Sequence, residues 1–269
     1  MSKIDELFAG LKASGGKAFM PFITAGDPDL EFTESLLRKL DSAGCHLVEL
    51  GIPYSDPIAD GPVIQASYTR ALNAGVQIDA IFDMLTRVTP DLTMPVVTMV
   101  SYSIIHRIGI DEYLQRAEAA GVSGAIVPDL PVDEAELLET KCREADFSLI
   151  HLITPTTSED RLKQIAERST GFIYYVSVTG ITGERKELPE GLLSSLEQLR
   201  QLTDTPICVG FGISAPAHVE YLKPVADGMI VGSAIVKRIA AIESGTDKEA
   251  VATEVVDFAN GMLAAAKAS

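Results

Sequence analysis

Cysteine is scarce in this sequence, and its three copies are unevenly spaced. Cys45, Cys142 and Cys208 form no C-x-x-C pair. This spacing argues against a disulfide framework and is typical of buried thiols in a reducing compartment. The sequence also holds four histidines, His46, His106, His151 and His218. None of them has H-x-H or H-E-x-x-H spacing, so we expect no protein-bound metal.

Long apolar segments are also missing. No stretch of the sequence approaches the roughly 20 residues that a transmembrane helix needs. The first residues include Asp5 and Glu6 and form no continuous apolar run, which argues against a secretory signal peptide. With 46% hydrophobic residues the chain can still build a large core. We therefore expect a soluble, cytoplasmic protein.

Positive charge is in short supply. The chain has 22 lysines and arginines against 38 aspartates and glutamates, a formal net charge of −16. Such a chain repels nucleic-acid backbones and anionic membrane surfaces, so we expect neither as a partner. A small phosphorylated substrate remains compatible with this charge, because backbone N–H groups at a helix start can bind phosphate.

Short apolar runs alternate with helical patterns along the chain. We expect strands at Ala18–Ile23, Leu47–Leu50, Val96–Val100, Ala125–Val127, Leu149–Ile153, Phe172–Val176, Ile207–Val209 and Met229–Val231. We expect helices at Glu31–Ala43, Pro62–Ala74, Ile110–Ala120, Glu134–Ala145, Ser158–Arg168, Leu192–Leu202, Ala215–Leu222 and Ser233–Ile239. Nearly continuous apolar runs suit parallel strands buried on both faces. Eight such units predict a single (β/α)8 TIM barrel as one catalytic domain over residues 1–269, with an open doubly wound sheet as the alternative.

Four segments lie outside this regular repeat. Asp5–Lys12 predicts an extra N-terminal helix that closes the bottom of the barrel, and Asp247–Ala266 predicts a final helix packed outside. Two loops, Pro53–Gly61 and Ser177–Lys186, are longer than a minimal connection. Barrel enzymes place their active sites at the carboxyl ends of the strands, so both loops should border the site. The glycines and threonines of the second loop predict a lid.

A carboxylate stands within an apolar strand. Glu49 lies between Val48 and Leu50, and Asp60 follows eleven residues later in a proline-rich loop. A buried carboxylate is costly without partners, so two of them together predict an acid/base pair. The alternatives are a structural ion pair for Glu49 and helix-start chemistry for Asp60. The predicted strands contain no lysine or arginine, which disfavours the ion pair and also excludes a Schiff-base aldolase.

Glycine motifs follow the last two predicted strands. Gly210-Phe211-Gly212 follows the seventh, and Gly232-Ser233 follows the eighth and opens a helix. Phosphate-binding barrels use these two loops, so we expect a phosphate site here. Apolar residues at the strand ends are Phe22, Val100, Val127, Ile153, Tyr174 and Phe211. A phosphate beside apolar walls predicts a phosphorylated substrate with a flat apolar part, which disfavours the sugar-phosphate isomerase that fold analogy alone would allow.

Several longer segments resemble one known family, the tryptophan synthase alpha subunit. They are Phe22–Pro28, Glu49–Gln65 with the pattern ELGIPYSDP-x-ADGP-x-IQ, Thr179–Gly183, Gly210–Ile213 and Gly232–Val236. The resemblance runs from Lys3 to the end, and the second segment is the most specific. It implies a (β/α)8 lyase of tryptophan biosynthesis. The reaction would be retro-aldol cleavage of indole-3-glycerol phosphate to indole and glyceraldehyde 3-phosphate.

The resemblance also implies roles for individual residues. Glu49 would shuttle protons between the glycerol hydroxyl and indole C3, while Asp60 would hold the indole N–H and stabilise the positive charge on the protonated ring. The indole pocket and its rim would be Phe22, Val100, Tyr102, Val127, Ile153 and Tyr174, with Thr182 in the closing lid. The phosphate site would be Gly183, Phe211, Gly212, Gly232 and Ser233.

No cofactor is expected in this chain, because the protonated indole is itself the electron sink. The family's partner is a beta subunit that carries pyridoxal phosphate, in an alpha2-beta2 complex. Ile104 stands where the family usually has an asparagine that faces this partner. This departure leaves a stand-alone indole-releasing lyase as the nearest alternative. A second alternative, from a different functional class, is a non-catalytic phosphate-binding barrel that activates a partner. The intact Glu49/Asp60 pair argues against the second.

Overall fold

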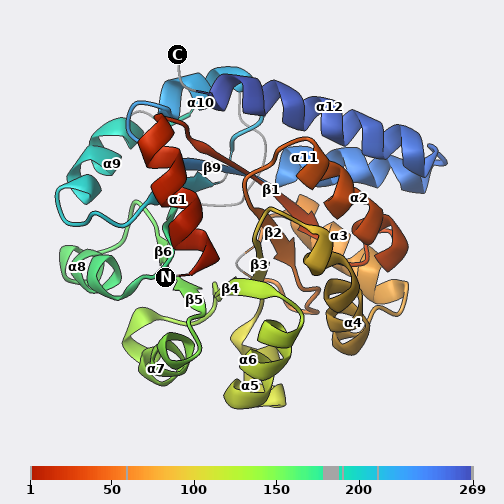
Figure 1. The fold of residues 1–269 in the computed structure, drawn as a ribbon, viewed down its shortest axis with the longest axis horizontal. Coiled ribbons are helices and arrows are strands. Elements are labelled where there is room, and N and C mark those ends of the chain that lie inside the picture. Colours follow the sequence, from red (N-terminus) through yellow and green to blue (C-terminus); the bar gives the residue numbers. More distant parts are fainter. Residues whose placement is uncertain (1, 59, 178–187, 190, 211, 268–269) are drawn as a thin grey trace.

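A closed parallel sheet forms the centre of the molecule (Figure 1). The structure, a computed structural model, describes residues 2–58, 60–177, 188, 189, 191–210 and 212–267. Its nine strands follow the order β5-β4-β3-β2-β1-β9-β8-β7-β6. The strands at the two ends of this order, β5 and β6, are consecutive in the chain and only His151 separates them, so the sheet closes on itself. The predicted barrel class is confirmed.

Most strands coincide closely with the expected ones, but the fourth begins at Val122, three residues before the expected Ala125, and the fifth is divided in two. They are β1 Ala18–Thr24, β2 Val48–Gly51, β3 Val96–Met99, β4 Val122–Ile126, β5 Ser148–Ile150, β6 Leu152–Ile153, β7 Ile173–Val176, β8 Ile207–Gly210 and β9 Gly228–Val231. The expected strand Leu149–Ile153 is split at His151, because its first half pairs with β4 and its second half with β7. Nine strands therefore occupy the eight positions of the barrel.

Helices surround the strands. They are α1 Lys3–Ser14, α2 Leu30–Ser42, α3 Pro62–Asn73, α4 Ile78–Val88, α5 Tyr102–Ile108, α6 Ile110–Ala119, α7 Glu136–Glu144, α8 Glu159–Arg168, α9 Leu192–Arg200, α10 Pro216–Leu222, α11 Ser233–Ile239 and α12 Lys248–Ala266. Short 3-10 turns are η1 Thr89–Asp91, η2 Val132–Glu134 and η3 Ala240–Ser244. The sequence prediction missed α4 and α5. The buried side chains of α4 recur at helical spacing, at Ile81, Phe82, Leu85 and Val88, so its signal was present.

Two buried clusters divide the apolar residues. The larger cluster lies between the strands and the outer helices. The smaller one fills the inside of the barrel and includes Met20, Val97 and Ile126 from three different strands, together with Phe172 just before β7. Ile4 and Phe8 of α1 belong to this inner cluster, and the Phe8 and Phe172 rings lie 5.9 Å apart. The N-terminal helix therefore closes one end of the barrel, as expected.

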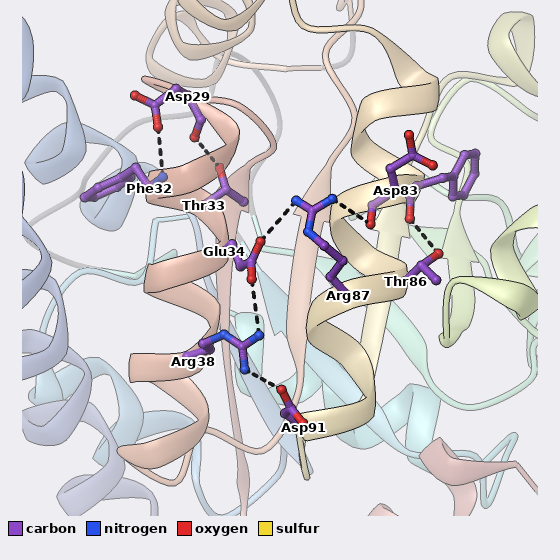
Figure 2. Close-up of polar contacts among 10 residues, drawn as sticks. Asp29, Phe32, Thr33, Glu34, Arg38, Asp83, Thr86, Arg87 and Asp91 are labelled. Atoms are coloured by element: carbon purple, nitrogen blue, oxygen red, sulfur yellow. Dashed lines mark hydrogen bonds and ion pairs between the residues drawn. The ribbon is translucent and has the colours of Figure 1, made fainter.

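The outer helices are also joined by charged side chains. Figure 2 shows Glu34 of α2 between two arginines, Arg38 of its own helix and Arg87 of α4. Arg38 also reaches Asp91 beyond α4. Arg87 and Asp91 are exposed and Glu34 and Arg38 are half-buried, so these ion pairs contribute little to stability and mainly keep this face polar. Within the part of the chain that the structure describes, no helix is long and apolar enough to cross a membrane.

Candidate active site

Glu49 points into the barrel from the middle of β2. Its side chain is 1% exposed, and neither of its carboxylate oxygens has a hydrogen-bond partner among the described residues. Burial raises the pKa of Glu49 well above its ordinary value, and the nearby charge of Asp60 raises it further. A structural ion pair, the alternative for this residue, is not present in the described chain. The residue is a buried acid at a cavity wall, which is typical of a proton-transfer group.

Asp60 lies just before α3, on the loop above Glu49. Its backbone N–H donates to the Pro57 carbonyl at 3.1 Å, and the Gln65 side-chain amide donates to the Asp60 carbonyl at 2.8 Å. Partial burial raises the pKa of the Asp60 carboxyl to about 6. The two carboxyl groups therefore have different environments, a pattern that separates a proton donor from a stabilising anion.

A cavity joins the two carboxylates to the predicted phosphate end. Its lining residues are Phe22, Glu49, Asp60, Ile64, Met99, Tyr174, Gly212, Ile213, Ile230, Gly232 and Ser233. The walls near Glu49 are apolar or aromatic, and burial raises the pKa of Tyr174 well above its ordinary value. Aromatic side chains pack tightly against bare backbone here. A Cβ built on Gly51 would lie 2.5 Å from Phe22 Cζ, and one built on Gly210 would lie 2.2 Å from Tyr174 Oη.

The opposite end of the cavity is lined by backbone. Gly212 has φ = +79°, a left-handed conformation that favours glycine. Gly232 and Ser233 lie where β9 leads into α11. The first N–H groups of a helix have no partner within it, so they can bind an anion. Neither lysine nor arginine is among the described residues that line this cavity. An anion held here would be bound by amides.

A second cavity of about 240 Å³ adjoins the first and leads outward. Its lining residues are Ile52, Tyr54, Asp56, Pro57, Ile58, Asp60, Tyr68, Met99, Val100, Ser101, Ser103, Pro128 and Asp129. Asp60 and Met99 line both cavities. The two spaces therefore meet at the Asp60 loop, and a bound molecule could extend from one into the other.

The structure brings only some of the predicted substrate-binding residues to these cavities. Phe22 and Tyr174 line the inner one, and Val100 lines the outer one. Val127 and Ile153 are buried in the larger core cluster instead. Tyr102 is half-buried, and its backbone N–H donates to Asp129 at 2.8 Å beside the outer cavity. Thr182, Gly183, Phe211 and the lid segment Thr179–Lys186 lie outside the described residues.

Sequence reasoning missed several apolar wall residues. Ile64 is on α3, while Met99 and Ile230 are on strands. A signal for the strand residues existed in the alternation of side chains along a strand. Glu49 pairs in register with Val97, so Met99, two residues on, faces the same side as Glu49. The sequence analysis chose wall residues by their position at the end of a strand and therefore selected Val100. Val100 is one residue after Met99, so its side chain does not face the same side as those of Glu49 and Met99.

The chain is similar to known proteins of one family. A family model described as the tryptophan synthase alpha chain matches residues 8–267. A tryptophan synthase alpha chain from Rhodopirellula baltica is 52% identical over 278 aligned residues, covering 100% of both chains. Another, from Trichormus variabilis, is 48% identical over 271 residues, again covering 100% of both. These relatives match the chain over its whole length.

Solved structures agree with the sequence relatives. The tryptophan synthase subunit alpha from Legionella pneumophila has a TM-score of 0.90 and 36% identity, with 98% of each chain covered. A chain of the tryptophan synthase a2b2 complex from Pyrococcus furiosus has a TM-score of 0.85 and 36% identity. That match covers 93% of this chain and 98% of the other.

Proposed function

The chain belongs to the tryptophan synthase alpha chain family, and on that premise we propose that Glu49 and Asp60 are its catalytic residues. The family reaction is the alpha reaction of tryptophan biosynthesis, a retro-aldol cleavage of indole-3-glycerol phosphate by a carbon–carbon lyase. The observation that carries the assignment of Glu49 is its carboxylate, buried at the cavity wall without a hydrogen-bond partner among the described residues.

Glu49 acts as the proton shuttle. Its raised pKa favours the protonated carboxyl, so the group can first protonate indole C3. The resulting carboxylate then takes the proton from the glycerol hydroxyl next to the bond that breaks. The carbon–carbon bond cleaves, its electron pair returns to the indole ring, and the hydroxyl carbon becomes the aldehyde of glyceraldehyde 3-phosphate. Glu49 ends the cycle protonated, as it began.

Asp60 stabilises the charge that this sequence creates. Protonation at C3 makes the indole ring cationic, and its N–H becomes a stronger hydrogen-bond donor. With a pKa of about 6, the Asp60 carboxylate is ionised at neutral pH and can accept that hydrogen bond. The protonated indole receives the electrons of the breaking bond, so the mechanism asks for no cofactor in this chain.

The substrate lies along the inner cavity. Its phosphate is bound by backbone N–H groups of Gly212, Ser233 and Gly183, and Gly232 allows a close approach. Phe22, Tyr174 and Met99 form the apolar wall for the indole ring. Val100 and Tyr102 border the outer space, and Thr182 belongs to the lid that closes over the substrate. The barrel acts as one catalytic domain over residues 1–269.

The partner is a beta subunit with pyridoxal phosphate, in an alpha2-beta2 complex. We place the contact on three loops of the strand-end face, Pro53–Asp56, Tyr102–Arg107 and Asp129–Pro131. These loops are already tied together, since Ser101 Oγ donates to Asp129 at 2.7 Å and Tyr54 Oη donates to Ser103 at 3.3 Å. These hydrogen bonds support a preformed docking face. Indole is small and apolar, so direct transfer to the partner avoids its loss to solvent.

Ile104 has a different position from the one that the family pattern suggested. Its side chain is 8% exposed and belongs to the larger core cluster. A polar residue there would be buried in the free chain, so Ile104→Asn should lower stability as well as alter the coupling between subunits. We propose a cytoplasmic location, which is supported by Cys45, Cys142 and Cys208, three free buried thiols.

A titration tests the activity and the partner separately. Purified protein is incubated with indole-3-glycerol phosphate, and indole is assayed with increasing amounts of the cognate beta subunit. We expect slow release by the chain alone and faster release with the partner, because the partner favours the closed lid. Absence of indole under both conditions would overturn the proposed reaction. Release that stays flat, with no complex by light scattering, would instead identify a stand-alone lyase.

A further inference from the structure

A buried ion pair lies one layer behind the cavity. Asp27, on the loop after β1, is 2% exposed, and Arg70, near the end of α3, is 14% exposed. The guanidinium binds the carboxylate with two hydrogen bonds, Nε to Oδ1 at 2.8 Å and Nη2 to Oδ2 at 2.6 Å. Bidentate pairs of this kind fix geometry as well as charge. Arg70 touches neither cavity, so its effect on catalysis has to act through the elements that it joins.

The first of these elements carries Asp60. Arg70 and Gln65 are on the same helix, α3, which begins directly after the Asp60 loop, and the Gln65 side chain binds the Asp60 carbonyl. A second buried contact joins α3 to β1, between Thr24 Oγ1 and Ser67 Oγ at 2.6 Å. Two side chains of α3, Ser67 and Arg70, therefore hold the helix against β1 and the loop that follows it, and the Asp60 loop leads directly into the start of this helix.

The second element carries the phosphate end of the site. Arg70 Nη1 lies 3.5 Å from Glu243 Oε2 in η3, the turn that follows α11. Helix α11 begins at Ser233. Val236 of α11 belongs to the same inner cluster as Ile64 and Tyr68 of α3. The two helices thus pack together at the cavity, and Arg70 joins both of them to the loop after β1.

We propose that Arg70, held by Asp27, is a positioning residue that sets the Asp60 carboxylate in register with Glu49 and with the phosphate-binding turn at Gly232–Ser233. This role rests on the proposed lyase reaction. Asp60 acts on the transition state, so its displacement should lower kcat more than it raises KM. Lysine in place of Arg70 keeps the charge but cannot form the bidentate bond.

The test compares two conservative variants, Arg70→Lys and Arg200→Lys. Arg200 also binds an aspartate, Asp227, but at the amino ends of β8 and β9, where barrel residues serve stability. For Arg70→Lys we expect kcat to fall about tenfold to a hundredfold, because small misplacements of a catalytic group are costly. The acidic limb of its kcat/KM profile should also move from about pH 6 to a lower pH. The reason is that a displaced Asp60 carboxyl becomes more hydrated, which lowers its pKa.

Arg200→Lys should keep the kcat, KM and pH profile of the wild type even where its melting temperature falls by a similar amount. If the wild type releases indole and Arg70→Lys has the same kcat and pH profile as the wild type, the positioning role alone is overturned. Wild-type protein that releases no indole would overturn the proposed reaction and the positioning role with it.

Discussion

Phe22 on β1 and Glu49 on β2 are register partners in a parallel pair, so their side chains point to the same side of the sheet, into the barrel. On its other side Glu49 pairs with Val97 of β3, which belongs to the inner apolar cluster. The carboxyl group is thus flanked by two apolar side chains and receives no charge from either neighbouring strand. Burial in this placement is the main physical cause of the raised pKa of Glu49, and the charge of Asp60 adds to it.

The first prediction concerns Glu49→Gln. The amide has nearly the same size but cannot exchange the proton, so indole release should fall by a factor on the order of 10²–10⁴. Affinity for glyceraldehyde 3-phosphate should change little, because the phosphate end of the cavity is lined by other residues. Single-turnover kinetics and product titration measure the two effects. A variant with wild-type kcat would rule out the shuttle.

The second prediction concerns Asp60 and pH. Because Asp60 has to be ionised to stabilise the indole cation, kcat/KM of the wild type should rise with pH through about 6, the pKa of this carboxyl. Asp60→Asn should lose most activity, and this rise should disappear from its profile. A pH–rate profile of both proteins checks this. An unchanged acidic limb in the variant would show that another group titrates there.

The third prediction concerns stability. The pKa of Glu49 is raised in the folded chain above the ordinary value of 4.5. Between these two pKa values the unfolded chain is ionised while the folded chain stays protonated, so the free energy of unfolding falls as pH rises through this window. Glu49→Gln removes this pH-dependent loss of stability, so its free energy of unfolding should exceed that of the wild type at neutral pH. The difference between the two proteins should be smaller near pH 4. Urea titrations at both pH values measure it. A difference in the free energy of unfolding that grows toward pH 4 would contradict this prediction.

The fourth prediction concerns Gly212→Val. Valine is strained at φ = +79°, and its side chain would displace the turn that binds phosphate. Loss of one or two hydrogen bonds to a charged group costs about 1.5–3 kcal/mol each, so KM should rise about tenfold or more. Gly44→Val is the matched control, since Gly44 has φ = +87° and open space around it, away from the cavity. Equal KM values in both variants would refute the phosphate site.

The sequence by itself was sufficient for the barrel and for the acid pair. Strands buried on both faces read as continuous apolar runs, so eight of them were visible without any structure. Glu49 stood out for the same reason, because an ionisable residue in such a run is costly and rarely incidental. The glycines after the last two strands were equally visible, and at Gly212 the backbone conformation, with φ = +79°, favours glycine.

Tertiary structure alone decided which apolar residues form the walls of the site. Residues at a strand end look equivalent in a list of apolar positions, yet the register with Glu49 puts Met99 at the cavity while Val127 packs outward into the larger core. The split of the fifth barrel strand at His151 followed from its pairing with different neighbours on its two halves. The bond between Asp27 and Arg70 spans 43 residues. Contacts of this kind depend on how the closed sheet brings distant segments together, and neither local pattern nor spacing encodes that by itself.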